Sequence, residues 1–254
     1  MSRNELSKDL PIFAPGIIRS VALNLDRVTG SRYPFNIPAI THLGTLQLHP
    51  KVTFLVGENG SGKSTLIEAI AVAVGFNAEG GSKNHNFETR QTASTLHEAL
   101  TICRGIRREK DGFFLRAESL YNVSTNLEET QVGFGWYGGR SLHDQSHGES
   151  FISLARNRFR GEGLYILDEP ESALSPARQL TLMQIIRDHV ENRGSQFLIA
   201  THSPILMAYP DANIYQLDDS GISPIEYEDT EHYQVTRDFL LNPGIYLHHL
   251  LDGS

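Results

Sequence analysis

The 254-residue sequence contains a single cysteine, Cys103, and few basic residues. One cysteine excludes an intramolecular disulfide and is typical of a reducing compartment. No apolar run approaches the roughly 20 residues that a membrane-spanning helix needs, and the polar residues 1–5 do not begin a secretory signal. A net charge of −8 argues against a globally basic nucleic-acid-binding protein. We therefore expect a cytoplasmic globular protein with no membrane segment.

Two local groups of basic residues are the candidates for a nucleic-acid contact. They are Arg104, Arg107, Arg108 and Lys110 in one group, and Arg156, Arg158 and Arg160 in the other. Both groups are expected on helices with acidic neighbours, so solvated helix faces are the better interpretation. Binding to DNA stays possible, but the net charge does not indicate it.

Residues 57–65 match the phosphate-binding pattern G-x-x-x-x-G-K-[ST]. The apolar run at 52–56 predicts a buried strand before the pattern, and apolar residues at helical spacing over 66–74 predict a helix after it. Backbone N–H groups of such a loop, together with the positive end of the helix dipole, bind phosphate oxygens. The predicted nucleotide-binding residues are Gly57, Glu58, Asn59, Gly60, Ser61, Gly62, Lys63, Ser64 and Thr65.

Three side chains from this loop and a later strand have specific predicted roles. Lys63 would reach the β- and γ-phosphates, and the Ser64 hydroxyl would ligate Mg²⁺. Asp168 follows the apolar run 164–167, where a strand is expected to end, and would hold the same ion directly or through water. Because Glu169 comes next, it is placed to orient and deprotonate the attacking water.

A histidine follows the second long apolar run of the sequence. His202 comes directly after residues 197–201, one βα unit beyond the acidic pair. There it would donate a hydrogen bond to a γ-phosphate oxygen and link the geometry of the site to the nucleotide state.

The remaining pattern predicts an α/β chain. Continuous apolar runs at 164–167 and 197–200 are typical of parallel strands covered on both faces, and a helix over 176–191 separates them. Further strands are expected at 17–25, 46–48 and 112–118, a helical stretch at about 93–104, and a mostly helical tail at 233–251. Loops are expected at 33–38, 75–86 and 133–148.

These motifs resemble those of the ABC-type ATPases, including their RecF/SMC-like branch, and most closely stand-alone bacterial ATPases of the AAA family. Residues 57–65 resemble Walker A, residues 164–169 Walker B, residues 172–175 the D-loop, and His202 the switch histidine. Residues 146–150 resemble the ABC signature, although His147 replaces its first glycine and Glu149 its glutamine. The resemblance covers roughly residues 17–205, with the motifs in the family's order.

The resemblance implies a P-loop NTPase fold of ABC type in one domain, 1–254. A mainly parallel central sheet flanked by helices is expected, with an antiparallel β part at the N-terminus. A helical signature subdomain would be inserted at about 87–160, and a helical tail would follow at 226–254. It also implies ATP and Mg²⁺ as cofactors and a homodimer on ATP binding, in which Ser146, Gly148 and Glu149 of one subunit contact the nucleotide of the other.

Two assignments stay open at this level. The Q-loop residue beside the metal is Glu118, by its position after a strand, or Gln91. The aromatic platform for adenine is Tyr33 or Phe35, and packing within the loop explains either residue equally well.

The biological role is less specified than the chemistry. The leading interpretation is an ATPase whose nucleotide state controls a partner, such as a nuclease, toxin or other effector, with DNA maintenance or defence suggested by family resemblance alone. The alternatives are the nucleotide-binding subunit of a membrane transporter and a regulatory switch that binds ATP but hardly hydrolyses it.

Overall fold

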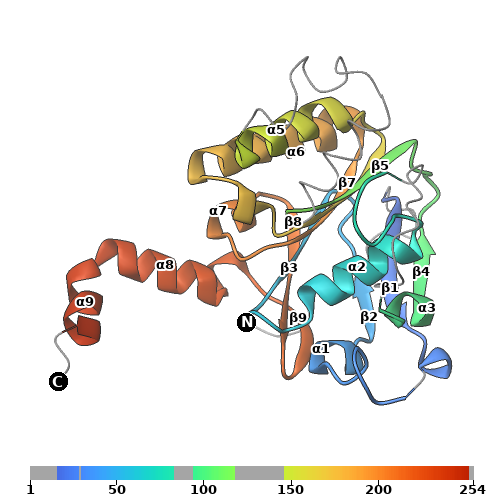
Figure 1. Cartoon of the computed structure of the whole chain (residues 1–254), viewed down its shortest axis with the longest axis horizontal. Coiled ribbons are helices and arrows are strands. Elements are labelled where there is room, and N and C mark those ends of the chain that lie inside the picture. Colours follow the sequence, from blue (N-terminus) through green and yellow to red (C-terminus); the bar gives the residue numbers. More distant parts are fainter. Residues whose placement is uncertain (1–15, 29, 83–93, 118–145, 252–254) are drawn as a thin grey trace, which may run out of the picture.

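The computed structural model describes residues 16–28, 30–82, 94–117 and 146–251, and its centre is a six-stranded sheet (Figure 1). The strand order is β5-β6-β7-β3-β8-β9. Neighbouring strands are parallel except β8 and β9, which are antiparallel. The bounds are β3 (Val52–Val56), β5 (Asp111–Arg116), β6 (Gly163–Asp168), β7 (Gln196–Ala200), β8 (Ala212–Asp218) and β9 (Gly221–Pro224).

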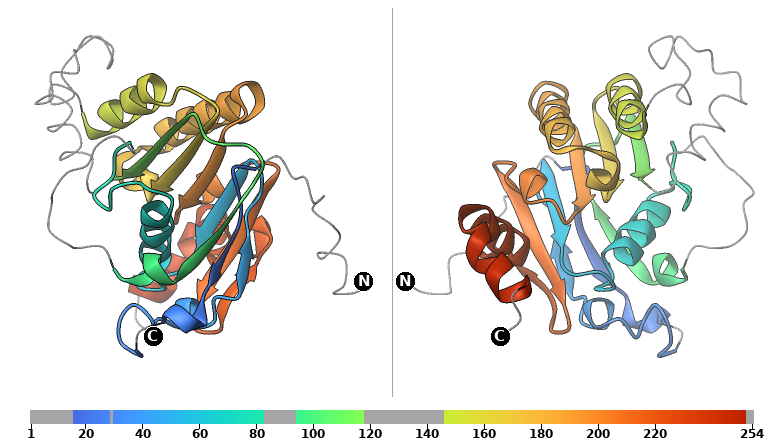
Figure 2. Two further views of the ribbon diagram at one scale, coloured as in Figure 1. Left: turned by 90° about the vertical axis from the view of Figure 1, so that its right-hand side faces the viewer. Right: turned by 60° about the vertical axis from the view of Figure 1, so that its left-hand side comes forward.

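Both faces of this sheet are buried, because successive side chains of a strand point to opposite sides. Phe54 of β3 and Tyr165 of β6 pack into one core with α5 (His147–Arg158), α6 (Pro176–Arg193) and α7 (Pro204–Met207). Their neighbours Leu55 and Ile166 pack into a second core with α2 (Lys63–Ala73). Figure 2 shows α5 and α6 side by side on their face of the sheet. The predicted mainly parallel sheet flanked by helices is confirmed.

A small antiparallel sheet of order β2-β1-β4 completes the second core. It consists of β1 (Ile18–Leu23), β2 (Thr45–Gln47) and β4 (Leu100–Arg104). The buried Gln196 of β7 links the two sheets: its Oε1 accepts from the N–H groups of Ile17 (2.9 Å) and Ile18 (2.8 Å), and its Nε2 donates to the carbonyl oxygens of Ile18 and His49. The predicted antiparallel part near the N-terminus is therefore present.

The helix expected over 93–104 is wrong. Within the described residues this range holds a four-residue helix, α3 (Leu96–Ala99), followed directly by β4. Thr101 and Ile102 are β-branched and fit a pleated strand, and β1 supplies the pairing partner, Val21 opposite Ile102 and Ala22 opposite Thr101. Tertiary pairing therefore overrides the local helical pattern. Strands β8 and β9 were not anticipated from the sequence at all.

The described part of residues 87–160 is not helical throughout. Besides α3 and α5 it contains β4 and β5, and β5 is an edge strand of the central sheet. A separate signature subdomain with these boundaries therefore stays a prediction. The described loop at 33–38 is irregular up to the short helix α1 (Pro38–Thr41), as expected.

The C-terminal helices α8 (Glu231–Leu241) and α9 (Pro243–Leu251) extend away from the body of the molecule (Figure 1). Neither contains a buried residue. Within the described ranges, other elements are connected by the single-turn 3₁₀ helices η1 (Leu25–Arg27), η4 (Pro170–Ala173) and η5 (Tyr227–Asp229). Among the described residues, no helix combines the length and apolarity needed to cross a bilayer.

Candidate active site

The glycine loop between β3 and α2 has a backbone that excludes side chains at two positions. Gly57 has φ +145°, and a Cβ on it would lie 2.3 Å from the carbonyl oxygen of Leu217. Gly62, the N-cap of α2, has φ +99°, and its Cβ would lie 2.8 Å from Cγ2 of Ile37. Both conformations favour glycine. Glycine is therefore required at both positions for the loop to turn and for α2 to begin at Lys63.

The loop holds two groups suited to phosphate. Lys63 is 3% exposed, and its Nζ donates to the carbonyl oxygens of Gly57 (2.9 Å) and Glu58 (2.8 Å). Burial lowers the pKa of Lys63, an effect that the carboxylates of Glu169 and Asp168 oppose. The hydroxyl of Ser61 is buried and has no hydrogen-bond partner among the described residues. Because the first N–H groups of a helix also lack intrahelical acceptors, a phosphate group fits the donors gathered here.

The two predicted metal ligands meet. Ser64 Oγ donates to Asp168 Oδ1 at 3.1 Å, and Asp168 is 5% exposed at the end of β6. Two adjacent ligands of an octahedral Mg²⁺ at about 2.1 Å from the ion lie about 3 Å apart, so the spacing fits this ion. The described residues hold no cluster of three or more His, Cys, Asp or Glu that could bind a metal. Further ligands would therefore be phosphate oxygens and water, as Mg²⁺ prefers.

Arg116 is a neighbour of this pair that the sequence analysis did not identify. It ends β5, which pairs with β6 so that Arg116 lies opposite Asp168. Its Nε lies 3.4 Å from Asp168 Oδ2, and its Nη1 lies 2.7 Å from Glu68 Oε2 on α2. A guanidinium between two carboxylates orients both of them. Asp168 is therefore held from one side by Arg116 and turned toward Ser64 on the other.

Glu169 has a strained backbone that turns its carboxylate out of the sheet. Its φ and ψ of 47° and 53° are left-handed, a conformation that costs a non-glycine residue about 1–3 kcal/mol. Its N–H donates to the carbonyl oxygen of Ala200 at 2.9 Å, which fixes the turn against β7. The side chain is 35% exposed, and its Oε1 lies 3.4 Å from Nε2 of His202. The left-handed turn therefore places this half-exposed carboxylate next to His202.

The loop carrying His202 is anchored by Glu171, whose role the sequence analysis missed. Thr201 Oγ1 donates to Glu171 Oε2 at 2.8 Å, and the N–H of His202 donates to Glu171 Oε1. Burial raises the pKa of Glu171, while these donors oppose the rise. The only signal in the sequence was a second acid two positions after Glu169.

His202 has a histidine partner from the C-terminal part of the chain. Its Nδ1 lies 2.9 Å from Nε2 of His232, in the first turn of α8. Burial lowers the pKa of both rings, and the nearby Lys63 ammonium lowers them further. Both shifts favour the neutral form of the imidazole, although Glu169 opposes the shift of His202. No sequence pattern pointed to His232.

The signature-like residues form the start of α5. Ser146 is the N-cap: its N–H donates to Glu149 Oε2 (3.0 Å), and its Oγ accepts from the N–H of Glu149 (3.4 Å). Glu149 thus completes a capping box, a helix-starting role open to glutamine as well. Arg178 of α6 donates through Nη1 to Ser146 Oγ (3.1 Å), and its Nη2 lies 3.0 Å from Glu149 Oε1.

Gly148 makes room for that arginine. A Cβ on Gly148 would lie 2.6 Å from Nη1 of Arg178 and 2.8 Å from the carbonyl oxygen of Ala173. Arg178 is half-buried, with a side chain 35% exposed. Apart from the capping box between them, the side-chain contacts of Ser146 and Glu149 within the described residues go to Arg178 of α6. Arg178 therefore places a cation next to the signature-like residues, and no sequence pattern indicated this cation.

The structure bears on the residue proposed to stack on adenine but not on the Q-loop residue. Phe35 is 7% exposed and lies in the second core, so its ring is not available to a base. Tyr33 is 64% exposed, and its hydroxyl lies 3.2 Å from Thr65 Oγ1 at the end of the glycine loop. The geometry favours Tyr33. Glu118 and Gln91 both lie outside the described residues.

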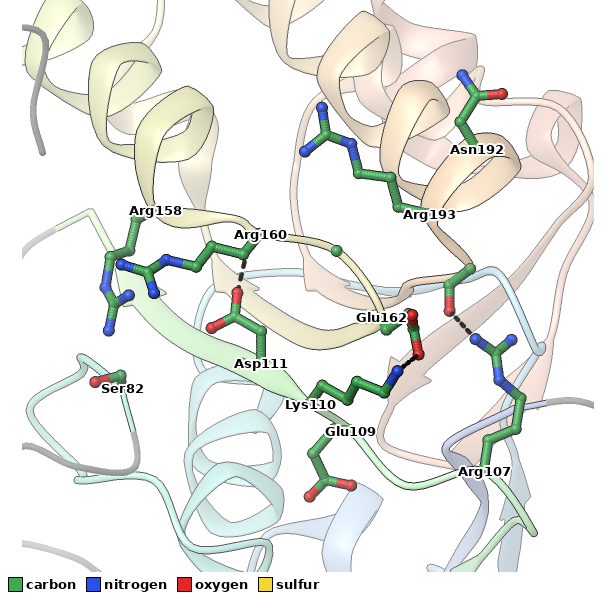
Figure 3. Close-up of a pocket in the computed structure, with 13 residues that line it drawn as sticks. Ser82, Arg107, Glu109, Lys110, Asp111, Arg158, Arg160, Glu162, Asn192 and Arg193 are labelled. Atoms are coloured by element: carbon green, nitrogen blue, oxygen red, sulfur yellow. Dashed lines mark hydrogen bonds and ion pairs between the residues drawn. The ribbon is translucent and has the colours of Figure 1, made fainter.

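Members of both basic groups line a cavity of about 830 Å³ at the opposite end of the strands from the glycine loop (Figure 3). It lies where β5 and β6 begin, whereas the glycine loop, Asp168 and His202 follow the ends of strands. The cations that line it are Arg107, Lys110, Arg158, Arg160 and Arg193. All residues of the two basic groups were expected on helices, but only Arg156 and Arg158 lie on one. Arg104 ends β4, and the other residues of the two groups lie in loops.

Several of these cations have structural partners. Arg158 and Arg193 lie in the last turns of α5 and α6, where the helix dipole favours positive charge. Arg107 Nη2 donates to the carbonyl oxygen of Gly194 at 3.0 Å, and Lys110 Nζ pairs with Glu162 at 2.8 Å. The helix dipole therefore accounts for two of these cations, and a hydrogen bond and an ion pair account for the other two.

Comparison with known proteins matches this chain to a family model, to individual relatives and to solved structures. A family model described as "AAA domain, putative AbiEii toxin, Type IV TA system" matches residues 52–134 and 141–208, together more than half of the chain. The cytochrome c biogenesis ATP-binding export protein CcmA of Vibrio parahaemolyticus is 30% identical over 174 residues, which cover 64% of this chain and 84% of that protein. The thiamine import ATP-binding protein ThiQ of Haemophilus influenzae is 28% identical over 167 residues, covering 59% and 75%.

Among solved structures, a putative metal-chelate type ABC transporter in an inward-facing conformation is similar with a TM-score of 0.52. The match covers 87% of this chain and 88% of that chain, at 17% identity. At this identity the likeness concerns the fold alone.

Proposed function

Because the chain belongs to the AAA-domain family described as "putative AbiEii toxin, Type IV TA system", we propose that it is a Mg²⁺-dependent ATPase of the ABC type that works as an ATP-bound homodimer. The observation that carries this proposal is the meeting of Lys63, the Ser64–Asp168 pair, Glu169 and His202 at one edge of the sheet. The relatives named above as ATP-binding proteins support the choice of nucleotide.

The residues divide the hydrolysis between them. Lys63 and the loop N–H groups would bind the β- and γ-phosphates. Ser64 and Asp168 would hold Mg²⁺, which would neutralise charge on the phosphate oxygens. Glu169 accepts a proton as the water oxygen bonds to the γ-phosphorus and the bond to the bridging oxygen breaks. His202 donates from Nε2 to a γ-phosphate oxygen.

The second half of each ATP site is proposed to come from the partner subunit. The N–H of Gly148 and the start of α5 offer a donor and a positive helix end to an anion. The hydroxyl of Ser146 donates to Glu149 Oε2 at 2.9 Å, so it would have to turn from that carboxylate to donate to a phosphate. Glu149 would repel a phosphate if it were free, but Arg178 pairs with it and adds its own positive charge. Arg178 therefore supports a contact to γ-phosphate despite the altered signature.

The variant Glu169→Gln tests the mechanism and the dimer together. It keeps the size of the side chain and removes the base, so turnover should fall by at least about 100-fold, while light scattering in saturating ATP and Mg²⁺ should detect a dimer. Glu162→Gln, a carboxylate near the opposite end of the same strand, is the matched control and should behave as wild type. A Glu169→Gln protein that stays monomeric refutes the ATP-bound dimer.

Lys63→Ala tests the phosphate site separately. Loss of the buried ammonium should weaken ATP binding in equilibrium titration, because the loop then lacks the cation that its carbonyl oxygens hold in place for the phosphates. Unchanged affinity would remove the glycine loop from the site.

The biological process can be proposed only as a class of partner that the ATPase controls. In a cytoplasmic setting its nucleotide state would control a partner such as a nuclease, toxin or other effector, in DNA maintenance or defence. The names of the relatives, which are export and import proteins, favour a second candidate, the nucleotide-binding subunit of a transporter. Capture of an integral membrane protein by the Glu169→Gln dimer would support the transporter, and capture of a nuclease or toxin would support the first role.

A further inference from the structure

We propose that His232, in the first turn of α8, is a positioning residue that sets the tautomer of His202 and makes ATP hydrolysis depend on the location of the C-terminal arm. The C-terminal arm is here α8 and α9 together. The inference rests on the proposed function, because it assigns the regulation of the same site.

His232 reaches His202 from the side opposite to Glu169. Its Nε2 lies 2.9 Å from Nδ1 of His202, and Nε2 of His202 lies 3.4 Å from Glu169 Oε1. The ring centroids of the two histidines are 5.0 Å apart, and the planes are inclined by 60°. The three side chains therefore form a chain from the arm to the proposed general base.

The contact with Glu169 indicates which ring nitrogens of His202 and His232 carry hydrogen. Two neutral imidazoles share one hydrogen across an N···N contact, so one ring donates and the other accepts. If His232 donates from Nε2, the hydrogen of His202 is on its own Nε2, where it faces the carboxylate of Glu169. In the reverse order, Nε2 of His202 would carry a lone pair against that carboxylate, which is repulsive. The first order is the one in which His202 can donate to a phosphate oxygen.

The stability of α8 does not explain the placement of this ring. Nδ1 of His232 is buried and has no hydrogen-bond partner in the described part of the chain. A buried ring nitrogen without a partner costs free energy, so the bond to His202 is what the ring gains by lying there. A histidine placed only for helix stability would be expected at the surface.

The buried part of the chain stops at the residue that begins the C-terminal arm. Thr230, the fully buried N-cap of α8, donates to the carbonyl oxygen of Tyr227 (2.7 Å) and accepts from the N–H of Tyr233 (3.4 Å). Beyond it no residue of α8 or α9 is buried, and Leu240 and Leu250 are 69% and 73% exposed. Movement of the arm would withdraw His232 from His202, which would then lose its fixed tautomer.

A comparison of three variants tests the positioning role. His232→Ala removes the donor, and kcat should fall on the order of tenfold or more with the Kd for ATP unchanged. His232→Gln carries an amide N–H that can replace Nε2–H, so it should recover most of the activity. His249→Ala, a histidine of α9, is the matched control and should behave as wild type. Equal losses in the Ala and Gln variants, or no loss in either, overturn the proposal.

A spectroscopic measurement separates this proposal from the proposed function. Imidazole ¹⁵N resonances should show His202 protonated at Nε2 in the wild type and as a tautomer mixture in His232→Ala, whether or not the protein hydrolyses ATP. Wild-type protein protonated at Nδ1 of His202 overturns the inference even if the ATPase is active. The expected tautomers without any ATP turnover would instead refute the proposed function and leave the positioning role standing.

Discussion

His189, buried in α6, should make the folded protein sensitive to mild acid. The residue is 3% exposed and lies edge-on to the rings of Phe159 and Tyr165, with centroid separations of 5.8 Å and 5.6 Å. Its Nδ1 has no hydrogen-bond partner among the described residues. Burial lowers the pKa of His189 from 6.5 to about 4, so the folded protein keeps this ring neutral where an unfolded chain would protonate it.

The sign and size of the effect follow from this difference. Between pH 6.5 and pH 4 the unfolded chain binds a proton that the folded protein does not, so the free energy of unfolding falls as the pH falls. At about 1.36 kcal/mol per pH unit, the cost from His189 alone is about 2 kcal/mol at pH 5 and about 3 kcal/mol at pH 4. Above pH 6.5 the residue makes no contribution to the pH dependence.

Urea unfolding of wild type and His189→Phe at several pH values between 7.5 and 4.5 measures this cost. Phenylalanine keeps an aromatic ring in the cluster and does not titrate, and its packing cost is the same at each pH. The stability of the variant relative to wild type should therefore improve by about 2 kcal/mol on going from pH 7.5 to pH 5. A difference that stays constant within about 0.5 kcal/mol over this range would refute the reasoning, because the ring would then titrate alike in both states.

Two further predictions concern the nucleotide contacts. Tyr33→Ala should raise the Kd for ATP by roughly 5- to 150-fold, since stacking of a base on an aromatic ring contributes about 1–3 kcal/mol. Tyr33→Phe keeps the ring and should bind ATP as wild type does in the same titration. If Tyr33→Ala also binds as wild type does, adenine does not stack on this ring. Arg178→Ala should reduce ATP-dependent dimer formation in light scattering, because Glu149 then faces the phosphate unpaired. Restored dimerisation in the double variant Arg178→Ala/Glu149→Gln would attribute the loss to the charge of Glu149. Full dimerisation of Arg178→Ala alone would contradict the prediction.

The site residues that could be predicted are those placed by local sequence and strand order. Residues 57–65 form a contiguous loop whose glycines require positive φ, so the motif by itself specifies the backbone. Asp168 and His202 follow two apolar strands, and adjacent parallel strands end at one edge of a sheet. Their meeting near Lys63 was therefore deducible, although the individual distances were not.

The residues that escaped prediction act through contacts between distant segments. Arg116 reaches Asp168 because β5 pairs with β6, and Arg178 reaches Ser146 because α5 packs against α6. His232 lies 30 positions after His202 and has no motif of its own. The mistaken helix over 93–104 has the same origin, since β4 depends on pairing with β1, and strand preference depends on such neighbours.

By itself the sequence determined which groups the proposed site contains: a glycine loop proposed to bind phosphate, a hydroxyl and a carboxylate proposed to hold Mg²⁺, and an acid and a histidine beyond two buried strands. These features depend on residue type and short spacing, which are properties of the chain alone. The tertiary structure decided how those groups are held. Glu171 anchors His202, Arg178 pairs with the altered signature, and His232 arrives from a helical arm, because side chains far apart in sequence meet only when helices and sheets pack.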